Sequence, residues 1–324
     1  MLNLGDQGPF FLPFQISSLF RIHHIFLLLH RSAMSSLRFA VYVAPPIPFQ
    51  SPDPRQPDGV WSPISCTLIY SEQEAVLVDT PITTQQTEEL IAWIEKVAPG
   101  RALSYIYVTH GHGDHFFGIP LLLQRFPDAI AVATPATIKH MEQQIEDEVF
   151  NTTWNVYFPD QIFQPFILAR PLPGNLQFKL QDRWVFQAVE CGHSDTHDST
   201  ILWVPDLKLA VCGDVVYGQV HQMLFEANTK AKRDEWTRAV EKVEALNPAY
   251  VVPGHRQAEE MDGIWHLETT KKYIADFGRI LAGDPQNPQE VFDAVIKLYP
   301  ERFNPAAVRL SSMGVFLVSK EDRI

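Results

Sequence analysis

The segment Thr109–His115 constrains the fold of this chain more than any other feature. It carries three of the 12 histidines of the chain and one aspartate, directly after an apolar run that begins at Leu103. Its two glycines let the backbone turn tightly enough to aim several side chains inward. Imidazole and carboxylate groups are ligands that zinc and similar divalent cations accept, so the segment predicts a metal-binding loop at the end of a buried strand. The candidate ligands are His110, His112, Asp114 and His115.

Three later segments repeat this arrangement of an apolar run, a glycine and a possible metal ligand. His193, Asp214 and His255 each follow a glycine, just past the expected strands 184–190, 207–212 and 250–252. Ligands that are distant in sequence can converge when the strands before them end at one edge of stacked sheets. The shared structural context makes a chance match of all four segments far less expected than a chance match of one.

Hydrophobic periodicity predicts an α/β fold of two mixed sheets flanked by helices. Strands and helices alternate in the first half, a β-rich region follows, and helices return toward the C-terminus. A proline-rich loop is expected over 45–57. The expected strands are 37–43, 66–70, 74–79, 103–109, 129–133, 178–180, 184–190, 200–204, 207–212 and 250–252, and the expected helices are 84–97, 119–125, 136–149, 233–246, 265–282 and 288–298.

The first 33 residues differ in pattern from the rest of the chain. Prolines, histidines and arginines interrupt their apolar runs, and the longest, Ile25–Leu29, is far shorter than the ~18 residues that span a bilayer. We expect 1–33 to be an extension that folding and activity do not need, and 34–324 to be one domain with C-terminal helices. No membrane partner is expected.

The charge and the cysteines limit the partners and the compartment. A net charge of −12 disfavours a nucleic-acid partner, because an acidic surface repels phosphate backbones. The three cysteines form neither an even disulfide set nor a Cys-x-x-Cys pair, which favours a reducing, cytoplasmic setting.

The ordered set His-x-His-x-Asp-His, then His, Asp and His, resembles the metallo-β-lactamase superfamily. The resemblance covers most of the chain from about Leu37 to His255, including an early aspartate, Asp79, after a strand. It implies a four-layer αββα sandwich and two divalent metal ions, most simply Zn²⁺. It further implies one metal on His110, His112 and His193, a second on Asp114, His115 and His255, and Asp214 bridging both.

Such a centre implies hydrolysis without a protein nucleophile. Two cations roughly 3.5–4 Å apart can hold a bridging water whose pKa falls from 15.7 toward ~7, and they polarise a carbonyl. Asp114 is the expected catalytic group that orients this water or takes its proton. Asp79 is expected either to orient a histidine ligand or to be a turn residue that ends a strand. Tyr217 matches a tyrosine that lactonases of the superfamily place beside the scissile ester, where a phenol can donate a hydrogen bond, and the alternative is an aromatic residue that packs at a strand end.

Departures within the superfamily narrow the activity. His112 stands where flavodiiron proteins carry glutamate, and Asp214 stands where true β-lactamases carry cysteine or serine. Asp214 resembles instead the bridging aspartate of glyoxalase II and the quorum-quenching lactonases. We therefore expect a metallo-hydrolase that opens a small cyclic ester or amide, in detoxification or secondary metabolism. A glutathione or carrier-protein thioesterase is the main alternative, and a persulfide dioxygenase, a nuclease and a non-catalytic module are weaker ones.

Several further residues have two readings. The aromatic run over 150–166 forms either a pocket wall for an apolar or aromatic substrate or core packing under a long loop. The turn 195–198 is expected to be a polar turn or to support the ligands. His221 is expected either at the surface or in the pocket, and His140 and His266 are expected to be surface histidines.

Overall fold

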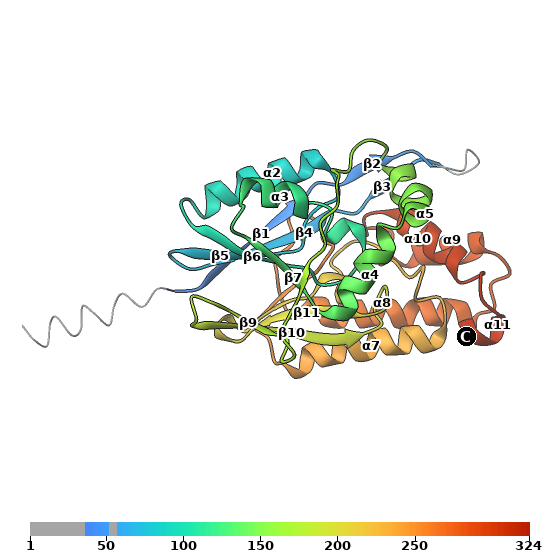
Figure 1. Cartoon of the computed structure of the whole chain (residues 1–324). Helices are drawn as coiled ribbons and strands as arrows, with labels where there is room; N and C mark the ends of the chain where they lie inside the picture. The colour runs from blue at the N-terminus through green and yellow to red at the C-terminus, as the bar shows by residue number, and fades with distance from the viewer. Residues whose placement is uncertain (1–35, 52–56) are drawn as a thin grey trace, which may run out of the picture. The chain divides into compact units, whose positions relative to one another are not determined.

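The computed structural model describes residues 36–51 and 57–324 (Figure 1). The expectation that 1–33 is a dispensable extension lies outside these residues. The elements below belong to the unit Leu37–Ile324. Within the described residues, no helix combines the length and apolar composition needed to cross a membrane.

The first sheet has six strands, and its centre consists of apolar strands that are buried on both faces. Neighbouring strands are antiparallel from β1 to β5 and parallel from β5 to β8. Helix α2 (Thr84–Val97) connects β5 to β6, and the hydroxyl of Thr83 caps its first turn by accepting from the Gln86 backbone N–H. In spatial order the strands are β1 (Arg38–Ala44), β4 (Ile64–Tyr70), β5 (Glu74–Val78), β6 (Ala102–Tyr107), β7 (Ile130–Ala133) and β8 (Arg170–Pro171).

The second sheet has five strands and comes from the β-rich part of the sequence. All its neighbours are antiparallel except β12 and β13, which are parallel because α7 (Lys230–Ala245) crosses over between them. In spatial order the strands are β13 (Tyr250–Val252), β12 (Leu209–Val211), β11 (Ser199–Val204), β10 (Trp184–Gly192) and β9 (Gln177–Leu180).

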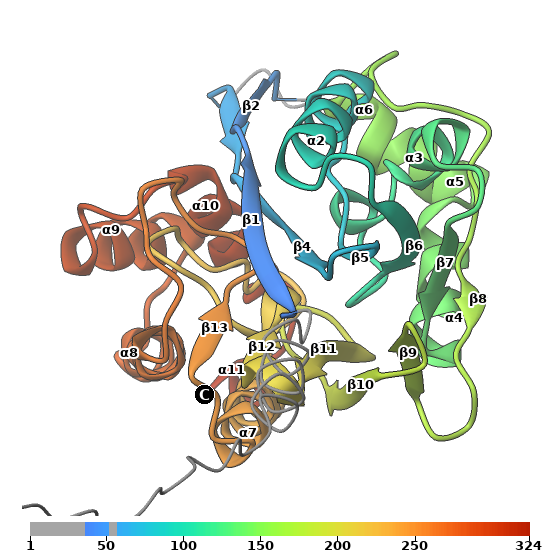
Figure 2. The same cartoon turned by 90° about the vertical axis from the view of Figure 1, so that its left-hand side faces the viewer.

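The two sheets face each other and helices cover their outer faces (Figure 2). Between the sheets lies a core that includes Val78, Tyr107, Phe186 and Val252. Helices α2 and α3 (Ile119–Arg125) pack on the first sheet, whereas α7 and α8 (Trp265–Ala282) pack on the second. The predicted four-layer αββα sandwich is confirmed.

Two local expectations were incomplete or wrong. The loop 45–57 contains strand β2 (Ile47–Phe49), which pairs with β3 (Gly59–Trp61) in a small ribbon. The helix expected over 136–149 ends early, because the backbone of Glu146 is extended and turns the chain so that later aromatic residues reach the core. The segments there are α4 (Pro135–Gln144), α5 (Asp147–Val149), the π-helical turn η2 (Phe150–Trp154) and α6 (Asn155–Tyr157).

Helices beyond the last expected ligand complete the chain. Helix α9 (Pro288–Leu298) was predicted, but α10 (Pro305–Gly314) and α11 (Lys320–Arg323) were not. Helix α10 is amphipathic only over a short length and contains small residues, which weakens its periodic signal. The described residues also form short 3₁₀ turns, which are η1 (Gly113–His115), η3 (Pro205–Leu207) and η4 (Gly213–Val215).

Candidate metal centre

The loops that follow β6, β12 and β13 meet at one edge of the two sheets. The carbonyl oxygen of Thr109, just past β6, accepts hydrogen bonds from the Thr200 backbone N–H (2.9 Å) and hydroxyl (2.6 Å) at the start of β11. These bonds join the first sheet to the second beside the histidine-rich loop. On the other side, the loop after β13 approaches η4 closely. A Cβ at Gly254 would lie 2.2 Å from Asp214 Oδ1, so the position before His255 requires glycine.

This meeting of loops brings together six of the seven predicted ligands, of which five are buried and His112 is partly exposed. Two overlapping groups have their potential ligand atoms within 4.8 Å of one another. The first is His110, His115 and Asp214, and the second is Asp114, His115 and His255. Asp214 contacts both His115 Nε2 and His255 Nε2 at 3.2 Å, through different oxygens. This position agrees with the bridging role that we propose for Asp214.

Three histidines of the cluster are held with one nitrogen turned outward. His115 Nδ1 donates to Asp79 Oδ2 (3.0 Å), and His255 Nδ1 donates to the Pro63 carbonyl (2.8 Å). Thr109 Oγ1 donates to Asp79, so it is an acceptor for His110 Nδ1 at 3.0 Å. Each neutral ring therefore directs the Nε2 lone pair into the cluster, which is the tautomer that a metal ligand needs. Asp79 orients His115, as expected from the sequence.

Unpartnered buried atoms in the cluster show that these residues fit a cation. His110 Nε2, His115 Nε2 and Asp214 Oδ1 are buried and have no hydrogen-bond partner. Burial lowers the pKa of His255, but the Asp214 and Asp114 carboxylates outweigh it and raise this pKa to about 10. The carboxylates thus hold protons on a neighbouring imidazole when no other positive charge is present. Divalent cations would compensate the same carboxylates and occupy the unpartnered lone pairs.

Asp114 is fixed by a residue that was not predicted from the sequence. The Trp61 indole N–H in β3 donates to Asp114 Oδ2 (2.8 Å), and this oxygen lies 3.5 Å from His255 Nε2. Trp61 precedes Asp114 by 53 residues, so no local pattern could connect the two.

His193 is the one predicted ligand that lies apart from the cluster. Its Nδ1 donates to the Ser194 carbonyl (2.7 Å), and its backbone N–H donates to Glu235 Oε1 (3.1 Å). Among the described residues, no group of three potential ligands includes His193. Asp195 groups with His110 and His112 instead.

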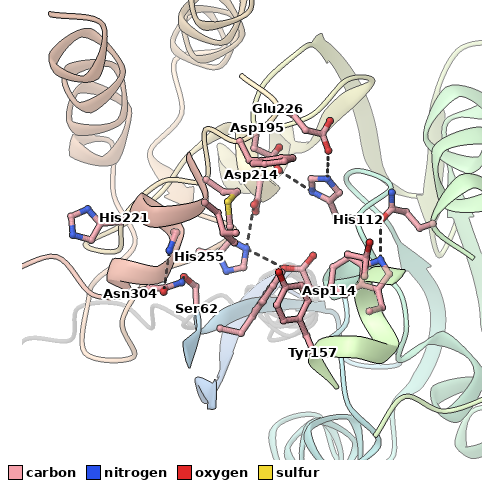
Figure 3. A pocket seen from close by; sticks show the side chains of 18 of the residues that line it. Ser62, His112, Asp114, Tyr157, Asp195, Asp214, His221, Glu226, His255 and Asn304 are labelled. Carbon is pink, nitrogen blue, oxygen red and sulfur yellow. Dashed lines mark hydrogen bonds and ion pairs between the residues drawn. The ribbon is translucent and has the colours of Figure 1, made fainter. Parts of the chain in front are cut away.

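A cavity of about 410 Å³ opens onto the candidate ligands (Figure 3). Trp61, Trp154, Tyr157 and Phe225 supply aromatic wall, and α10 supplies Ala307 and Leu310. Part of the aromatic run over 150–166 packs in the core and part forms the pocket wall. Phe150 and Phe158 are core residues, whereas Trp154 and Tyr157 line the cavity. The carboxylates at the cavity are Asp114, Asp195, Asp214 and Glu226, and its described lining contains no lysine or arginine.

Tyr217 and His221 both line this cavity. The buried Tyr217 hydroxyl donates to Asp214 Oδ2 (2.5 Å), while burial and the Asp214 carboxylate raise the pKa of the phenol well above its usual value. Tyr217 is therefore a protonated donor. His221 Nδ1 contacts the Tyr273 hydroxyl at 2.9 Å, and burial and Arg302 lower the pKa of His221 to about 4. His221 is a neutral, buried residue rather than a surface one.

Two other histidines correct the expectation of surface positions. His140 is buried against the metal-binding loop, where a Cβ on Gly111 would lie 2.4 Å from its ring. His266 is buried at the start of α8 and its Nε2 donates to the Met261 carbonyl (2.9 Å). Both histidines lie on helix faces that pack inward. A histidine among polar residues gives no sequence signal for such a position.

Comparison with known proteins agrees with the fold. The sequence profile of the Metallo-beta-lactamase superfamily matches residues 59–255. A metallo-beta-lactamase type 2 of Bacteroides fragilis is 23% identical over 219 residues, which are 66% of this chain and 76% of that protein. A ribonuclease Z of Halobacterium salinarum is 28% identical over 132 residues, only 40% of this chain and 39% of its own length.

Solved structures share the fold at low sequence identity. DIM-1 metallo-beta-lactamase superposes with a TM-score of 0.51 at 21% identity, covering 74% of this chain and 97% of its own. FIM-1 of Pseudomonas aeruginosa, in its mono-zinc form, superposes with a TM-score of 0.51 at 17% identity, covering 77% of this chain and 93% of its own. The fold and the buried histidine and aspartate cluster define the class of metallo-hydrolases. The chain belongs to the metallo-beta-lactamase superfamily.

Proposed function

We propose that this enzyme hydrolyses a small, largely apolar or aromatic molecule that carries a cyclic ester or amide. The observation that carries the proposal is the cavity, which joins aromatic walls directly to the candidate ligands. Aromatic walls favour stacking and apolar contact over ion pairing. The acidic groups at the cavity disfavour a polyanionic substrate such as RNA.

The ligands that we propose are those of the sequence analysis: His110, His112, Asp114, His115, His193, Asp214 and His255. Bound divalent cations, for which Zn²⁺ is the simplest choice, would polarise the substrate carbonyl and activate water. Asp114, which accepts a hydrogen bond from the Trp61 indole, would accept the proton of the attacking water. Burial excludes competing solvent around these carboxylates and strengthens their electrostatic effect.

A thioesterase is the second candidate function. The supporting observation is a relative, the atrochrysone carboxyl ACP thioesterase of Cryptosporiopsis sp., 32% identical over 81 residues. Those residues are 25% of this chain and 24% of that protein. Docking of a glutathione or carrier-protein substrate would need basic residues, and the candidates Lys271 and Lys272 pair with Glu244 and Asp276 on the α7 and α8 surface. They do not line the cavity.

The two functions are separated by specificity constants. We expect kcat/KM to be higher for lactones or lactams with aromatic substituents than for size-matched glutathione thioesters. The measurement uses metal-loaded enzyme and one assay of ring opening or thiol release for each pair. A clear preference for the thioester, reduced by Lys271→Ala and Lys272→Ala, would overturn the cyclic-ester proposal.

The Tyr217→Phe variant tests the proposed hydrogen-bond donor. We expect kcat on the best substrate to fall by up to ~10²–10³-fold, because one donor at the reacting oxygen is lost. Metal content should stay at the wild-type value, because the Asp214 carboxylate remains. Tyr107→Phe is a matched control, since it removes another buried hydroxyl, one that contacts Thr200 between the sheets. An unchanged kcat for Tyr217→Phe would assign Tyr217 a purely structural role.

A further inference from the structure

We propose that His221 is a substrate-binding residue whose Nε2–H donates a hydrogen bond to an oxygen of the substrate other than the reacting carbonyl. The side chain lines the cavity that opens onto the candidate ligands (Figure 3). It follows Tyr217 in the same segment and is not one of the predicted ligands. The inference rests on the proposed function, because it adds a second recognition group to the cyclic ester or amide.

The His221 ring is fixed by contacts on two sides. The backbone N–H of His221 donates to the Phe303 carbonyl (2.8 Å), and Val220 pairs with Phe303 in an isolated parallel bridge. On the other side, Nδ1 lies 2.9 Å from the hydroxyl of Tyr273 on α8. The side chain is 1% exposed, so its neighbours leave the ring little freedom to turn. A ring held in this way presents its other nitrogen to a ligand without further ordering.

The contact with Tyr273 assigns the hydrogen of the His221 ring to Nε2. Tyr273 is buried, and among the residues that the structure describes its hydroxyl has no acceptor other than His221 Nδ1. If the ring nitrogen were the donor, the buried phenol hydrogen would be left without an acceptor, which is costly. The phenol therefore donates to Nδ1. Burial and Arg302 lower the pKa of His221 to about 4, so the neutral ring carries a single hydrogen, on Nε2.

The Nε2–H of His221 is free to bind a molecule inside the cavity. The contact with Tyr273 occupies Nδ1, and no hydrogen bond or ion pair joins Nε2 to another of the described residues. Because the side chain lines the cavity, a bound molecule can reach this nitrogen. Donors in buried positions are almost always paired. An oxygen acceptor on the substrate would pair this one.

Ser62 supplies a second donor beside the segment that pairs with His221. Asn304 directly follows that segment, and both Asn304 and Ser62 line the cavity. Asn304 Oδ1 caps α10 by accepting from the Ala307 backbone N–H (3.3 Å), which leaves Nδ2 to donate to Ser62 Oγ (2.7 Å). Ser62 Oγ is thus an acceptor in this bond. Its own hydrogen has no acceptor in the described part of the chain, so it can also be donated to a ligand.

These two donors narrow the chemical class of the substrate. Neutral N–H and O–H groups bind carbonyl, hydroxyl or ether oxygens. In Figure 3, His221 and Ser62 lie on the side of the pocket away from His112 and Glu226. A substrate whose scissile bond lies at the candidate ligands could therefore place a second oxygen at these donors. The expected substrate is an apolar or aromatic cyclic ester or amide that carries a further ketone, amide or phenolic oxygen.

The experiment measures kcat/KM for pairs of phenyl-substituted butyrolactones. Each pair carries an acetyl or an isopropenyl group at the same ortho, meta or para position. The two groups have nearly the same shape, but only acetyl accepts a hydrogen bond. At the best position, metal-loaded wild type should prefer the acetyl member by ~3–10-fold, which is the effect of one hydrogen bond.

Variants of His221 test whether this residue causes the preference. His221→Leu should abolish it, and His221→Gln, which keeps an N–H near the position of Nε2, should restore part of it. His266→Leu is the matched control and should keep the preference, because it removes another buried histidine that does not line the cavity.

Failure of the inference is distinguishable from failure of the proposed function. A wild type that opens both members of every pair with equal kcat/KM would support the hydrolase proposal and overturn the role of His221. An acetyl preference that persists in His221→Leu would overturn it as well. If no lactone is opened, the proposed function fails, and a binding measurement decides the role of His221.

That measurement uses the wild-type chain and requires no turnover. In Zn²⁺-loaded, ¹⁵N-labelled protein, long-range ¹H–¹⁵N spectra distinguish an imidazole nitrogen that carries a hydrogen from one that carries a lone pair. We expect His221 in the Nε2–H form. Acetophenone should shift its Nε2 signal, whereas isopropenylbenzene, which has no acceptor, should shift it much less. The Nδ1–H form, or equal shifts with the two probes, would contradict the inference.

Discussion

The Asp214→Ala variant is expected to lose at least ~10²-fold in kcat/KM and to hold less metal than the wild type. Residues that merely support metal ligands are worth 10–100-fold, and Asp214 contacts histidines of both groups. Its removal also frees the Tyr217 hydroxyl, which donates to the same carboxylate. Metal content and steady-state kinetics on one preparation measure both effects.

Folding of this variant should survive in the metal-free state. The substitution removes the attraction of Asp214 for His115 and His255, but it also relieves repulsion with Asp114 and Asp195. Asp206→Ala is the matched control, because Asp206 is an exposed aspartate in η3, the turn that precedes β12. Normal metal occupancy with near-normal turnover in Asp214→Ala would show that Asp214 does not bridge the site.

Removing the metal should abolish hydrolysis and lower the thermal stability of the chain. Without cations, the cluster leaves buried carboxylates and lone pairs unpaired, which disfavours the folded state. A ligand present at 1,000 times its Kd stabilises the folded state by about 4 kcal/mol, so we expect Tm to fall by several degrees. Dialysis against a chelator, followed by thermal unfolding and activity assays, measures both changes.

Restoring the metal provides the control for this experiment. Adding Zn²⁺ back to the dialysed protein should return both Tm and activity. The Asp214→Ala variant, treated in parallel, should show a smaller shift in Tm because it has less metal to lose. An activity and a Tm that do not respond to the chelator would contradict a metal-dependent mechanism.

Much of the fold follows from local patterns, which explains where prediction succeeded. Helix α2 has its predicted bounds because a capping threonine and an apolar face both lie within the helix itself. The strands β5 and β6 are likewise predicted from short apolar stretches of the sequence. The β2–β3 ribbon was missed because its strands have only three residues each and lie among prolines. Helix α10 was missed because its signal is short and weak.

The site was predictable only where a ligand follows a strand in a short motif. His110, His115, Asp214 and His255 converge as expected, since each loop leaves a strand at the same edge of the sandwich. His193 lies apart from the other predicted ligands, after a register irregularity in β10 that no pattern of residue types encodes. Trp61 and Glu226 reach the cluster from distant segments, so only the folded chain reveals them.

The central claim is that this chain is a two-metal hydrolase, and the metal content of the purified protein tests it most directly. Elemental analysis, after dialysis against Zn²⁺ and removal of free metal, should find about two divalent metal ions per chain. Two metal sites on either side of the Asp214 carboxylate, which contacts His115 and His255, would account for this ratio. Protein that contains no metal when purified and takes up none from Zn²⁺ would contradict the claim.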